Sequence, residues 1–360
     1  MVIGMQEETR DRVRDQRIER IVELVSPASL LDDLPLGEKR EKTVVRGRAE
    51  VKSILDREDD RLLVVVGPCS VHDVGAALEY GGKLAKESEA LGDDLLIAMR
   101  VYFEKPRTTT GWKGLINDPH LDGSYDVNSG LRMARTLLLQ VVDLGLPVGC
   151  EFLDPITPQY ISDTVAWGAI GARTTESQIH RQLGSGLSMP IGFKNRTDGD
   201  LQVAVDAVRA AAAPHAFAGI DDSGTPAILH TVGNPDGHVI LRGGGGVPNH
   251  DAAGVSRALA LLRGAGLPER LVIDASHDNS GKDPVRQLGA AREIAEQVGE
   301  GNEAIVGVML ESFLVEGRQA LGGEEPLVYG QSITDACIDW DSTHALLGDL
   351  AAAVRARRGP

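Results

Sequence analysis

The chain has 360 residues, of which 42% are hydrophobic and 25% charged, and its formal net charge is −16 at pH 7. This length suits two domains or one α/β barrel with additions, and the acidic balance argues against a nucleic-acid partner, because phosphate backbones bind basic surfaces. Apolar runs are far shorter than the ~20 residues of a membrane helix, and residues 1–20 lack the apolar core of a signal peptide, so we expect no membrane segment.

The first sixty residues are predicted to form an arm that precedes the main domain. Residues 17–25 (RIERIVELV) have a helix-like pattern, whereas residues 26–40 (SPASLLDDLPLGEKR) are predicted to be irregular because proline interrupts them. A helical stretch over 49–56 then leads to the first strand-like run. We therefore divide the chain into a helical arm at 1–60, which we expect to make oligomer and regulatory contacts, and a main domain at 61–360, which we expect to be the catalytic barrel.

Eight strand-like runs follow, most of them separated by helix-compatible segments. They are short and largely apolar, as expected of buried parallel strands. The runs span 61–66, 95–100, 146–151, 167–173, 190–194, 238–242, 271–277 and 304–311. The alternation predicts an α/β fold, namely a single (β/α)8 TIM barrel, with a doubly wound sheet as the alternative. Residues 214–233, between the fifth and sixth runs, are predicted to form an inserted β-hairpin.

The runs share a further feature, because each ends in or is followed by a charged or metal-binding residue. In a barrel the carboxyl ends of the strands meet at one face, where active sites are built. The pattern therefore predicts one site that contains all of these side chains. In chain order they are Cys69, Arg100, Glu151, Arg173, Lys194, Arg242, His277 and Glu311.

Cations are concentrated in residues 99–118 (MRVYFEKPRTTTGWKGLIND), which surround the end of the second run. A solvated charged face is the ordinary explanation of such a cluster. However, Lys105 and Arg107 would join the four cations at strand ends, and arginine and lysine together suit phosphate or carboxylate groups. We infer a strongly anionic ligand with two anionic groups, or two anionic substrates.

A second constellation suggests a metal site. Cys69, His277 and Glu311 come from runs that become neighbours when a barrel closes, and Asp335 lies in the following loop. One thiolate, one imidazole and two carboxylates suit manganese, iron, cobalt or zinc. On spacing alone, a buried cysteine beside a separate histidine–carboxylate hydrogen bond explains the same residues equally well.

The remaining cysteines, Cys150 and Cys337, are expected in the core, with Cys337 in a helix. Three cysteines are too few and too scattered for a disulfide framework, which favours a reducing cytoplasm.

Seven segments resemble successive blocks of the type I 3-deoxy-D-arabino-heptulosonate 7-phosphate (DAHP) synthases. The arm with LLDDLPL resembles the N-terminal extension of the amino-acid-regulated branch of that family. Long blocks in one order are far more specific than a single short motif. The segments are VVVGPCSVHD, MRVYFEKPRTTTGWKGLINDP, GAIGARTTESQIHRQLGSGLSMPIGFKN, HVILRGG, IDASHDNS, VGVMLESFLVEG and GQSITDACI.

The resemblance implies a barrel enzyme that condenses phosphoenolpyruvate with erythrose 4-phosphate, the first committed step of the shikimate route to aromatic amino acids. It implies that Arg107 and Thr108 bind the sugar phosphate, within the Lys105–Thr108 stretch (KPRT) that holds the phosphosugar. It also implies phosphoenolpyruvate ligands at Arg100, Lys105, Arg173, Lys194 and Arg242, and metal ligands at Cys69, His277, Glu311 and Asp335.

Catalytic roles are assigned to three residues, of which His277 acts as a metal ligand. Lys105 is expected to protonate the developing alkoxide, since burial among cations lowers the pKa of a lysine. Glu151 is either the group that orients or deprotonates the attacking water, or a structural counter-charge for the cations.

Feedback regulation is a further expectation from the resemblance, with phenylalanine or tyrosine as the effector and a homodimer or homotetramer as the assembly. Two departures from the family pattern are Gly245, where a lysine is familiar, and Gly219, where a serine is familiar. A desensitised enzyme therefore stays an alternative. The expected effector residues are Pro158, Gln159, Leu183, Leu187, Ser188 and Phe217.

Two other functions were weighed against DAHP synthesis. A 3-deoxy-D-manno-octulosonate 8-phosphate synthase shares the chemistry and the anionic site, but is expected to lack both the KPRT stretch and the arm. A non-catalytic sensor of aromatic amino acids is expected to lose metal ligands or cations, and this chain retains them.

Overall fold

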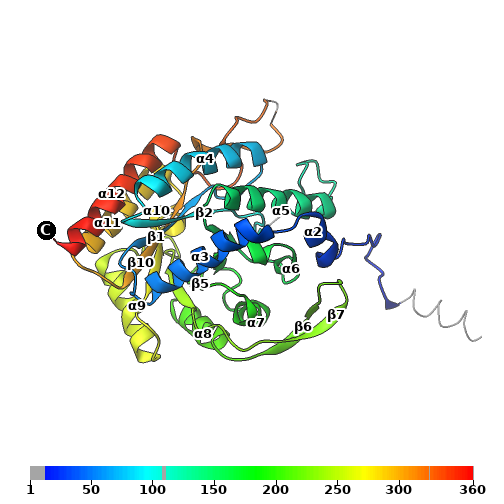
Figure 1. The fold of residues 1–360 in the computed structure, drawn as a ribbon, viewed down its shortest axis with the longest axis horizontal. Helices are drawn as coiled ribbons and strands as arrows, with labels where there is room; N and C mark the ends of the chain where they lie inside the picture. The colour runs from blue at the N-terminus through cyan, green and yellow to red at the C-terminus, as the bar shows by residue number, and fades with distance from the viewer. Residues whose placement is uncertain (1–12, 108–110, 324, 360) are drawn as a thin grey trace, which may run out of the picture.

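Eight parallel strands close into a barrel in the computed structural model, which describes residues 13–107, 111–323 and 325–359 (Figure 1). The strands neighbour one another in the order β1-β10-β9-β8-β5-β4-β3-β2, and β10 pairs with β1 to complete the circle. The barrel strands are β1 (Leu62–Gly67), β2 (Leu95–Arg100), β3 (Val148–Glu151), β4 (Trp167–Ile170), β5 (Ile191–Lys194), β8 (His238–Leu241), β9 (Leu271–Asp274) and β10 (Ile305–Glu311). All eight lie in or overlap the expected runs, and the (β/α)8 barrel is confirmed against the doubly wound sheet.

The strands are apolar along their length because both of their faces are buried. In β1 the side chains of Leu63 and Val65 belong to the cluster inside the barrel, whereas Val64 and Val66 belong to the larger cluster around it. Alternate side chains of a strand point to opposite faces, so a continuous apolar run supplies both layers. Complete burial of one such side chain contributes about 1.5–3 kcal/mol to the hydrophobic free energy of folding.

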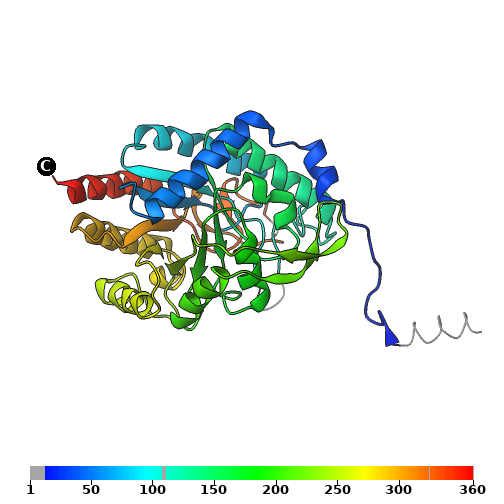
Figure 2. The same cartoon turned by 60° about the horizontal axis from the view of Figure 1, so that its bottom comes forward.

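Helices surround the barrel, and α12, α11 and α9 follow one another on one side of it (Figure 2). Five of them begin after an aspartate whose carboxylate accepts a hydrogen bond from a backbone amide in the first turn. Such a cap typically stabilises a helix by ~1 kcal/mol. The surrounding helices are α4 (Val74–Ala90), α5 (Val127–Asp143), α7 (Gln178–Gly186), α8 (Gln202–Ala211), α9 (Ala252–Gly264), α11 (Pro284–Gly299) and α12 (Trp340–Arg358).

The N-terminal region differs from the sequence prediction. Residues 18–26 form neither helix nor strand, whereas α2 (Pro27–Asp33) and α3 (Gly37–Leu55) occupy most of the segment expected to be irregular. Proline at the first helical position removes only an amide that has no partner there, so Pro27 begins α2 instead of breaking it. The helix predicted at 17–25 is wrong because its apolar side chains, such as Ile21, remain exposed.

Helix α3 packs against the barrel itself. Val51, Ile54 and Leu55 belong to the same apolar cluster as the interior residues of β1 and Trp167 of β4. In Figure 1 the helix crosses in front of the barrel strands and covers the end of the barrel where this cluster lies. The first sixty residues thus contribute to the core as well as to the arm.

The predicted hairpin is confirmed between β5 and β8. Its antiparallel strands are β6 (Ala216–Ile220) and β7 (Pro226–His230), and the hairpin extends away from the barrel strands (Figure 1). Helix α2 contacts its turn, because the backbone amide of Ala28 donates a hydrogen bond to the carbonyl of Asp222 over 2.7 Å.

Shorter elements lie in the connections between the barrel strands and helices. They are α6 (Pro158–Ile161), η1 (Ser162–Thr164), α10 (His277–Ser280), β11 (Val315–Arg318) and β12 (Gln331–Ser332). Across the described part of the chain, no helix is both long enough and apolar enough to span a membrane.

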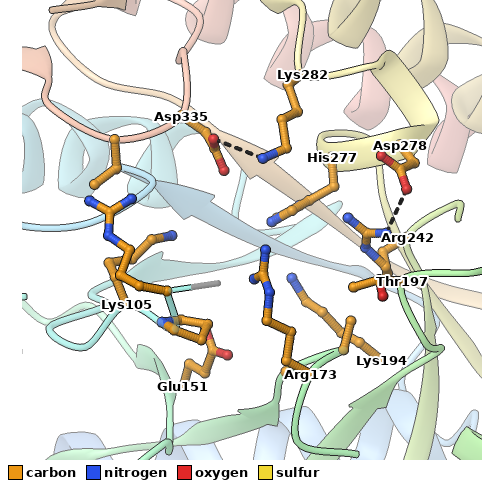
Figure 3. Close-up of a pocket in the computed structure, with 15 residues that line it drawn as sticks. Lys105, Glu151, Arg173, Lys194, Thr197, Arg242, His277, Asp278, Lys282 and Asp335 are labelled. Carbon is orange, nitrogen blue, oxygen red and sulfur yellow. Dashed lines mark hydrogen bonds and ion pairs between the residues drawn. The ribbon is translucent and has the colours of Figure 1, made fainter. Parts of the chain in front are cut away.

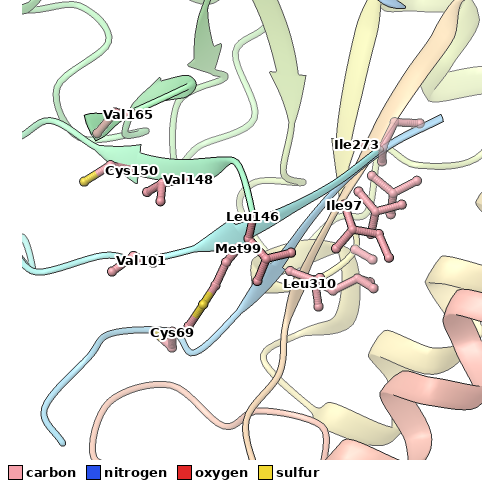
Figure 4. Close-up of a cluster of buried hydrophobic side chains, with 14 of the residues drawn as sticks. Cys69, Ile97, Met99, Val101, Leu146, Val148, Cys150, Val165, Ile273 and Leu310 are labelled. Carbon is pink, nitrogen blue, oxygen red and sulfur yellow. The ribbon is translucent and has the colours of Figure 1, made fainter. Parts of the chain in front are cut away.

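The cysteines are buried as predicted, but Cys337 does not lie in the expected helix. Cys69, Cys150 and Cys337 are all buried in the large apolar cluster, part of which Figure 4 shows. Cys337 lies in a β-bridge with Gly317, just before α12, and not in a helix as expected.

Candidate active site

A cavity of about 880 Å³, including its open mouth, lies at the carboxyl ends of the barrel strands (Figure 3). Five of the eight expected strand-end residues line it, together with Lys105, Arg107 and Asp335 from the loops. The five are Glu151, Arg173, Lys194, Arg242 and His277. The structure thus brings five of the eight strand-end residues together at one cavity, while their roles stay predictions.

The other three strand-end residues, Cys69, Arg100 and Glu311, are buried beside one another. Arg100 and Glu311 form an ion pair with 3.0 Å between Nη2 and Oε1, and neither side chain is more than 2% exposed. Arg100 also donates hydrogen bonds to the carbonyls of Pro68 and Cys69. Its guanidinium thus binds protein groups at the end of β2, and it is not among the described residues that line the cavity.

Three potential metal ligands lie together. Ligand atoms of Cys69, Glu311 and Asp335 are all within 4.8 Å of one another. Lys105 Nζ lies 3.1 Å from Cys69 Sγ, and Lys282 Nζ lies 3.0 Å from Asp335 Oδ1. Burial would raise the pKa of Asp335, but Lys105 and Lys282 outweigh it and lower that pKa to about 2. This carboxylate is therefore charged and able to bind a cation.

His277 lies beside this group of three. Its Nε2 is 3.7 Å from Glu311 Oε1, and its Nδ1 is 2.9 Å from Asp274 Oδ2. A carboxylate on one ring nitrogen typically orients a metal-binding histidine. A thiol and two carboxylates, with this imidazole beside them, suit a divalent metal ion, and the complete set of four ligands stays a prediction.

Asp274 was missed by the sequence analysis, although it links two expected site residues. Its buried carboxylate accepts from Lys194 Nζ over 2.8 Å as well as contacting His277. Burial alone would raise the pKa of Asp274, but these two partners hold it well below its usual range. The available signal was an acidic residue inside the apolar run LVIDASH.

Two further charged residues that the sequence analysis did not assign also line the cavity, namely Asp278 and Lys282. Asp278 Oδ2 lies 2.8 Å from Arg242 Nη1. Three cations of the site are therefore paired with carboxylates, namely Lys194, Arg242 and Lys282. Arg173 is exposed at the cavity, and no ion pair of its side chain occurs among the described residues.

Lys105 differs from the expectation in its pKa. Burial lowers the pKa of Lys105, but Cys69 and Glu311 outweigh burial and raise it above its ordinary value. The expected lowering of this pKa is not found, because the effects of Cys69 and Glu311 exceed those of burial and of Arg100. Lys105 is a charged lysine in this structure.

The structure places only some of the remaining predicted site residues at the cavity. Arg107 lines the cavity and donates from Nε to the carbonyl of Trp112 over 2.8 Å. Thr108 lies outside the described residues. Glu151 lines the cavity and is 8% exposed, and its two expected roles both remain predictions.

The expected effector residues lie on α6, on α7, in the two residues that follow α7, and on the hairpin. Gln159 Nε2 donates to the carbonyl of Ile220 over 3.1 Å, and Ser185 on α7 hydrogen-bonds to Thr231 over 2.7 Å. Pro158 and Leu183 are buried, Leu187 and Phe217 are partly buried, and Ser188 is exposed. The structure therefore brings the three elements together, while their binding role stays a prediction.

Comparison with known proteins identifies the family. The model of the DAHP synthetase I family matches residues 38–348. The chain belongs to the DAHP synthetase I family.

Full-length relatives agree with this assignment. The chain is 58% identical over 351 residues to a phospho-2-dehydro-3-deoxyheptonate aldolase of Corynebacterium glutamicum, covering 96% of this chain and 95% of that protein. It is 56% identical over 345 residues to the Phe-sensitive enzyme of Escherichia coli K12, covering 96% and 98%. Other relatives are named as Trp-sensitive or Tyr-sensitive forms.

A solved structure supports the same conclusion. The Francisella tularensis phospho-2-dehydro-3-deoxyheptonate aldolase superposes with a TM-score of 0.93 at 51% identity, covering 95% of this chain and all of that one. The family, the barrel and the DAHP synthase activity expected from the sequence are thereby confirmed.

Proposed function

We propose that the cavity at the carboxyl ends of the barrel strands is where this enzyme condenses phosphoenolpyruvate with erythrose 4-phosphate and water to form DAHP and phosphate. The observation that carries this assignment is the convergence of cationic strand ends beside a thiol–carboxylate cluster. Cations bind the anionic groups of both substrates, and the cluster provides the ligands of a divalent ion.

The anion ligands divide into two sets. Arg100, Lys105, Arg173, Lys194 and Arg242 are assigned to phosphoenolpyruvate, and Arg107 and Thr108 to the sugar phosphate. Support comes from the positions of Lys194 and Arg242, which line the cavity at the end of β5 and directly after the neighbouring strand β8. Arg100 belongs to the first set by the resemblance, but it is buried in its pair with Glu311 outside the cavity lining. It would support the set indirectly by aligning the end of β2 with the end of β10.

Cys69, His277, Glu311 and Asp335 would hold the metal ion, for which manganese, iron, cobalt and zinc are the candidates. When bound, such an ion supplies Lewis acidity to the aldehyde oxygen of the sugar. The Asp274 contact holds the His277 ring with Nε2 toward Glu311, and Lys282 is paired with Asp335 over 3.0 Å.

The protein groups account for the proton transfers. The methylene carbon of phosphoenolpyruvate forms the new bond to the aldehyde carbon, and the charged Lys105 donates a proton to the aldehyde oxygen. Water then adds to C2 of the enolpyruvyl unit, and Glu151 takes the water proton. The resulting phosphohemiketal expels inorganic phosphate and leaves the ketone of DAHP.

Regulation and assembly complete the proposal. The relatives named for sensitivity to an aromatic amino acid support an effector site formed by α6, α7 and the hairpin. Residues 1–60 would contribute oligomer and regulatory contacts, since residues 18–26 extend from the barrel and α2 contacts the hairpin turn (Figure 2). A homodimer or homotetramer and a cytoplasmic location belong to the same proposal.

The test follows the ultraviolet absorbance of phosphoenolpyruvate in EDTA-treated protein after manganese, iron, cobalt or zinc is returned separately. We expect absorbance to fall with erythrose 4-phosphate and to stay constant with arabinose 5-phosphate. No reaction with any metal, combined with a rise in melting temperature on addition of phenylalanine or tyrosine, would replace this proposal by the sensor alternative.

A further inference from the structure

Asp278 places a carboxylate directly against Arg242, one of the cations proposed to bind phosphate in this cavity. It lines the cavity with its side chain 22% exposed, and its Oδ2 lies 2.8 Å from Nη1 of Arg242. Figure 3 shows this contact at the side of the cavity, near His277 and Thr197. Unlike Asp274, which is almost completely buried, Asp278 is accessible from the cavity.

The backbone fixes the Asp278–Arg242 pair in place. The amide of Asp278 donates to the carbonyl of Arg242 over 3.2 Å, and the amide of Arg242 donates to Asn195 Oδ1 over 2.9 Å. Gly243, at φ 68°, allows the two segments to approach, because a Cβ there would lie 2.8 Å from that of Asp278. The carboxylate is therefore held against Arg242 by the fold.

Arg242 still has donors to offer when it is paired. A guanidinium carries five N–H groups, and Asp278 accepts from Nη1. The buried Nε has no hydrogen-bond partner among the described residues. A phosphate group bound to Arg242 would therefore lie near the Asp278 carboxylate. Both groups are negatively charged, so they repel each other.

We propose that Asp278 sets the phosphate affinity of the pocket by neutralising Arg242 in the empty site and repelling a phosphate group bound there. This inference rests on the proposed function, in which phosphate enters on phosphoenolpyruvate and leaves as the inorganic ion. Binding the phosphate group equally tightly in the substrate and in the transition state lowers KM without raising kcat. A fixed counter-charge weakens that binding and favours release of inorganic phosphate.

The test compares Asp278→Asn with the wild-type chain, because asparagine keeps the shape and an acceptor oxygen but removes the charge. Asp278→Ala removes the acceptor as well. A matched control is Asp33→Asn, since Asp33 Oδ2 pairs with Arg132 Nη2 over 2.7 Å on the exposed surface of α2 and α5. Calorimetry with inorganic phosphate measures the Kd, and inhibition by phosphate is measured under turnover.

We expect Asp278→Asn to bind inorganic phosphate about tenfold more tightly than the wild type, because loss of one nearby negative charge changes binding by roughly that factor. Asp278→Ala should also bind more tightly, and Asp33→Asn should match the wild type. Phosphate should raise the melting temperature of Asp278→Asn more than that of the wild type. Unchanged or weaker phosphate binding in Asp278→Asn would overturn the inference and leave Asp278 as a group that only orients Arg242.

Separate readouts distinguish this inference from the proposed function. If the wild type forms DAHP while Asp278→Asn binds phosphate with unchanged Kd, only the inference fails. If the wild type forms no DAHP, the proposed function fails, whereas tighter phosphate binding by Asp278→Asn still supports the charge effect. The metal content of each variant is measured alongside, because Asp278 follows His277 in the chain.

Discussion

Nδ1 of His277 lies 2.9 Å from Oδ2 of the buried Asp274, while Nε2 on the other side of the ring lies 3.7 Å from Glu311 Oε1. The same Asp274 oxygen lies 2.8 Å from Lys194 Nζ. One carboxylate therefore positions a proposed metal ligand and a proposed phosphate ligand, which couples the two halves of the site.

Asp274→Asn should weaken metal binding. The amide retains the shape of the carboxylate but loses its charge, so the imidazole is oriented less firmly and is a poorer ligand. Changes at such partners typically reduce metal affinity 10–100-fold, and titration with manganese or zinc measures the effect. Glu293→Gln is the control, because Glu293 contacts His250 over 2.9 Å outside the site. Equal metal affinities in both variants would contradict the role of Asp274.

Lys282→Met should strengthen metal binding. Lys282 Nζ lies 3.0 Å from Asp335 Oδ1, where it competes with a metal ion for the carboxylate and repels it. Removing this charge should lower the metal Kd by about tenfold, as measured by titration at constant ionic strength. Lys86→Met, which changes an exposed lysine on α4, should leave the Kd unchanged. Weaker metal binding in Lys282→Met would show instead that the lysine holds Asp335 in position.

The sequence predicts the barrel and many of the residues at the cavity because buried strands are recognised as apolar runs that end in polar residues. Glu151 and Lys194 are the last residues of β3 and β5, and Arg242 directly follows β8, so each stands at the end of an apolar run. Asp274 was missed because it ends β9 while the predicted run continued to His277. A polar residue inside an apparently apolar run was the only available sign.

The backbone conformation around Asp278 and Lys282 could not be predicted from the hydrophobic pattern of the sequence. His277 and Lys282 have φ values of 51° and 63°, in the left-handed region that non-glycine residues rarely adopt. Tertiary contacts around α10 select this conformation, and no hydrophobic period encodes it. The N-terminal error has a related cause, because burial of α3 against the barrel, and not local pattern, extends that helix to Gly37.

Arg100→Ala should destabilise the metal-free protein by about 3–5 kcal/mol, because it leaves the buried Glu311 carboxylate without its ion-pair partner. Chemical denaturation monitored by circular dichroism measures this loss. Arg40→Ala removes a comparable but more exposed arginine–aspartate pair with Asp143, and should cost at most about 1 kcal/mol. Similar losses in both variants would show that Glu311 is readily accommodated without Arg100.

Glu104→Gln should alter the pH dependence of stability. Glu104 precedes Lys105, and its buried carboxyl accepts hydrogen bonds from the Thr157 hydroxyl over 3.1 Å and from the Leu153 and Asp154 amides over 3.4 Å. Burial, with a smaller effect of Asp154, raises the pKa of Glu104 from 4.5 to about 7.

The sign of this effect follows from proton binding. Between pH 4.5 and 7 the folded protein keeps the Glu104 proton that the unfolded chain has lost, so the free energy of unfolding falls as pH rises through this window. The loss of unfolding free energy approaches about 3 kcal/mol above pH 7. Glutamine does not titrate, so the Glu104→Gln variant should not show this loss. Denaturation at several pH values should therefore show Glu104→Gln gaining stability relative to the wild type as pH rises. Glu176→Gln, at an exposed pair with Arg196, should follow the wild-type profile. Parallel profiles for Glu104→Gln and the wild type would mean that Glu104 is ionised in the folded protein at neutral pH.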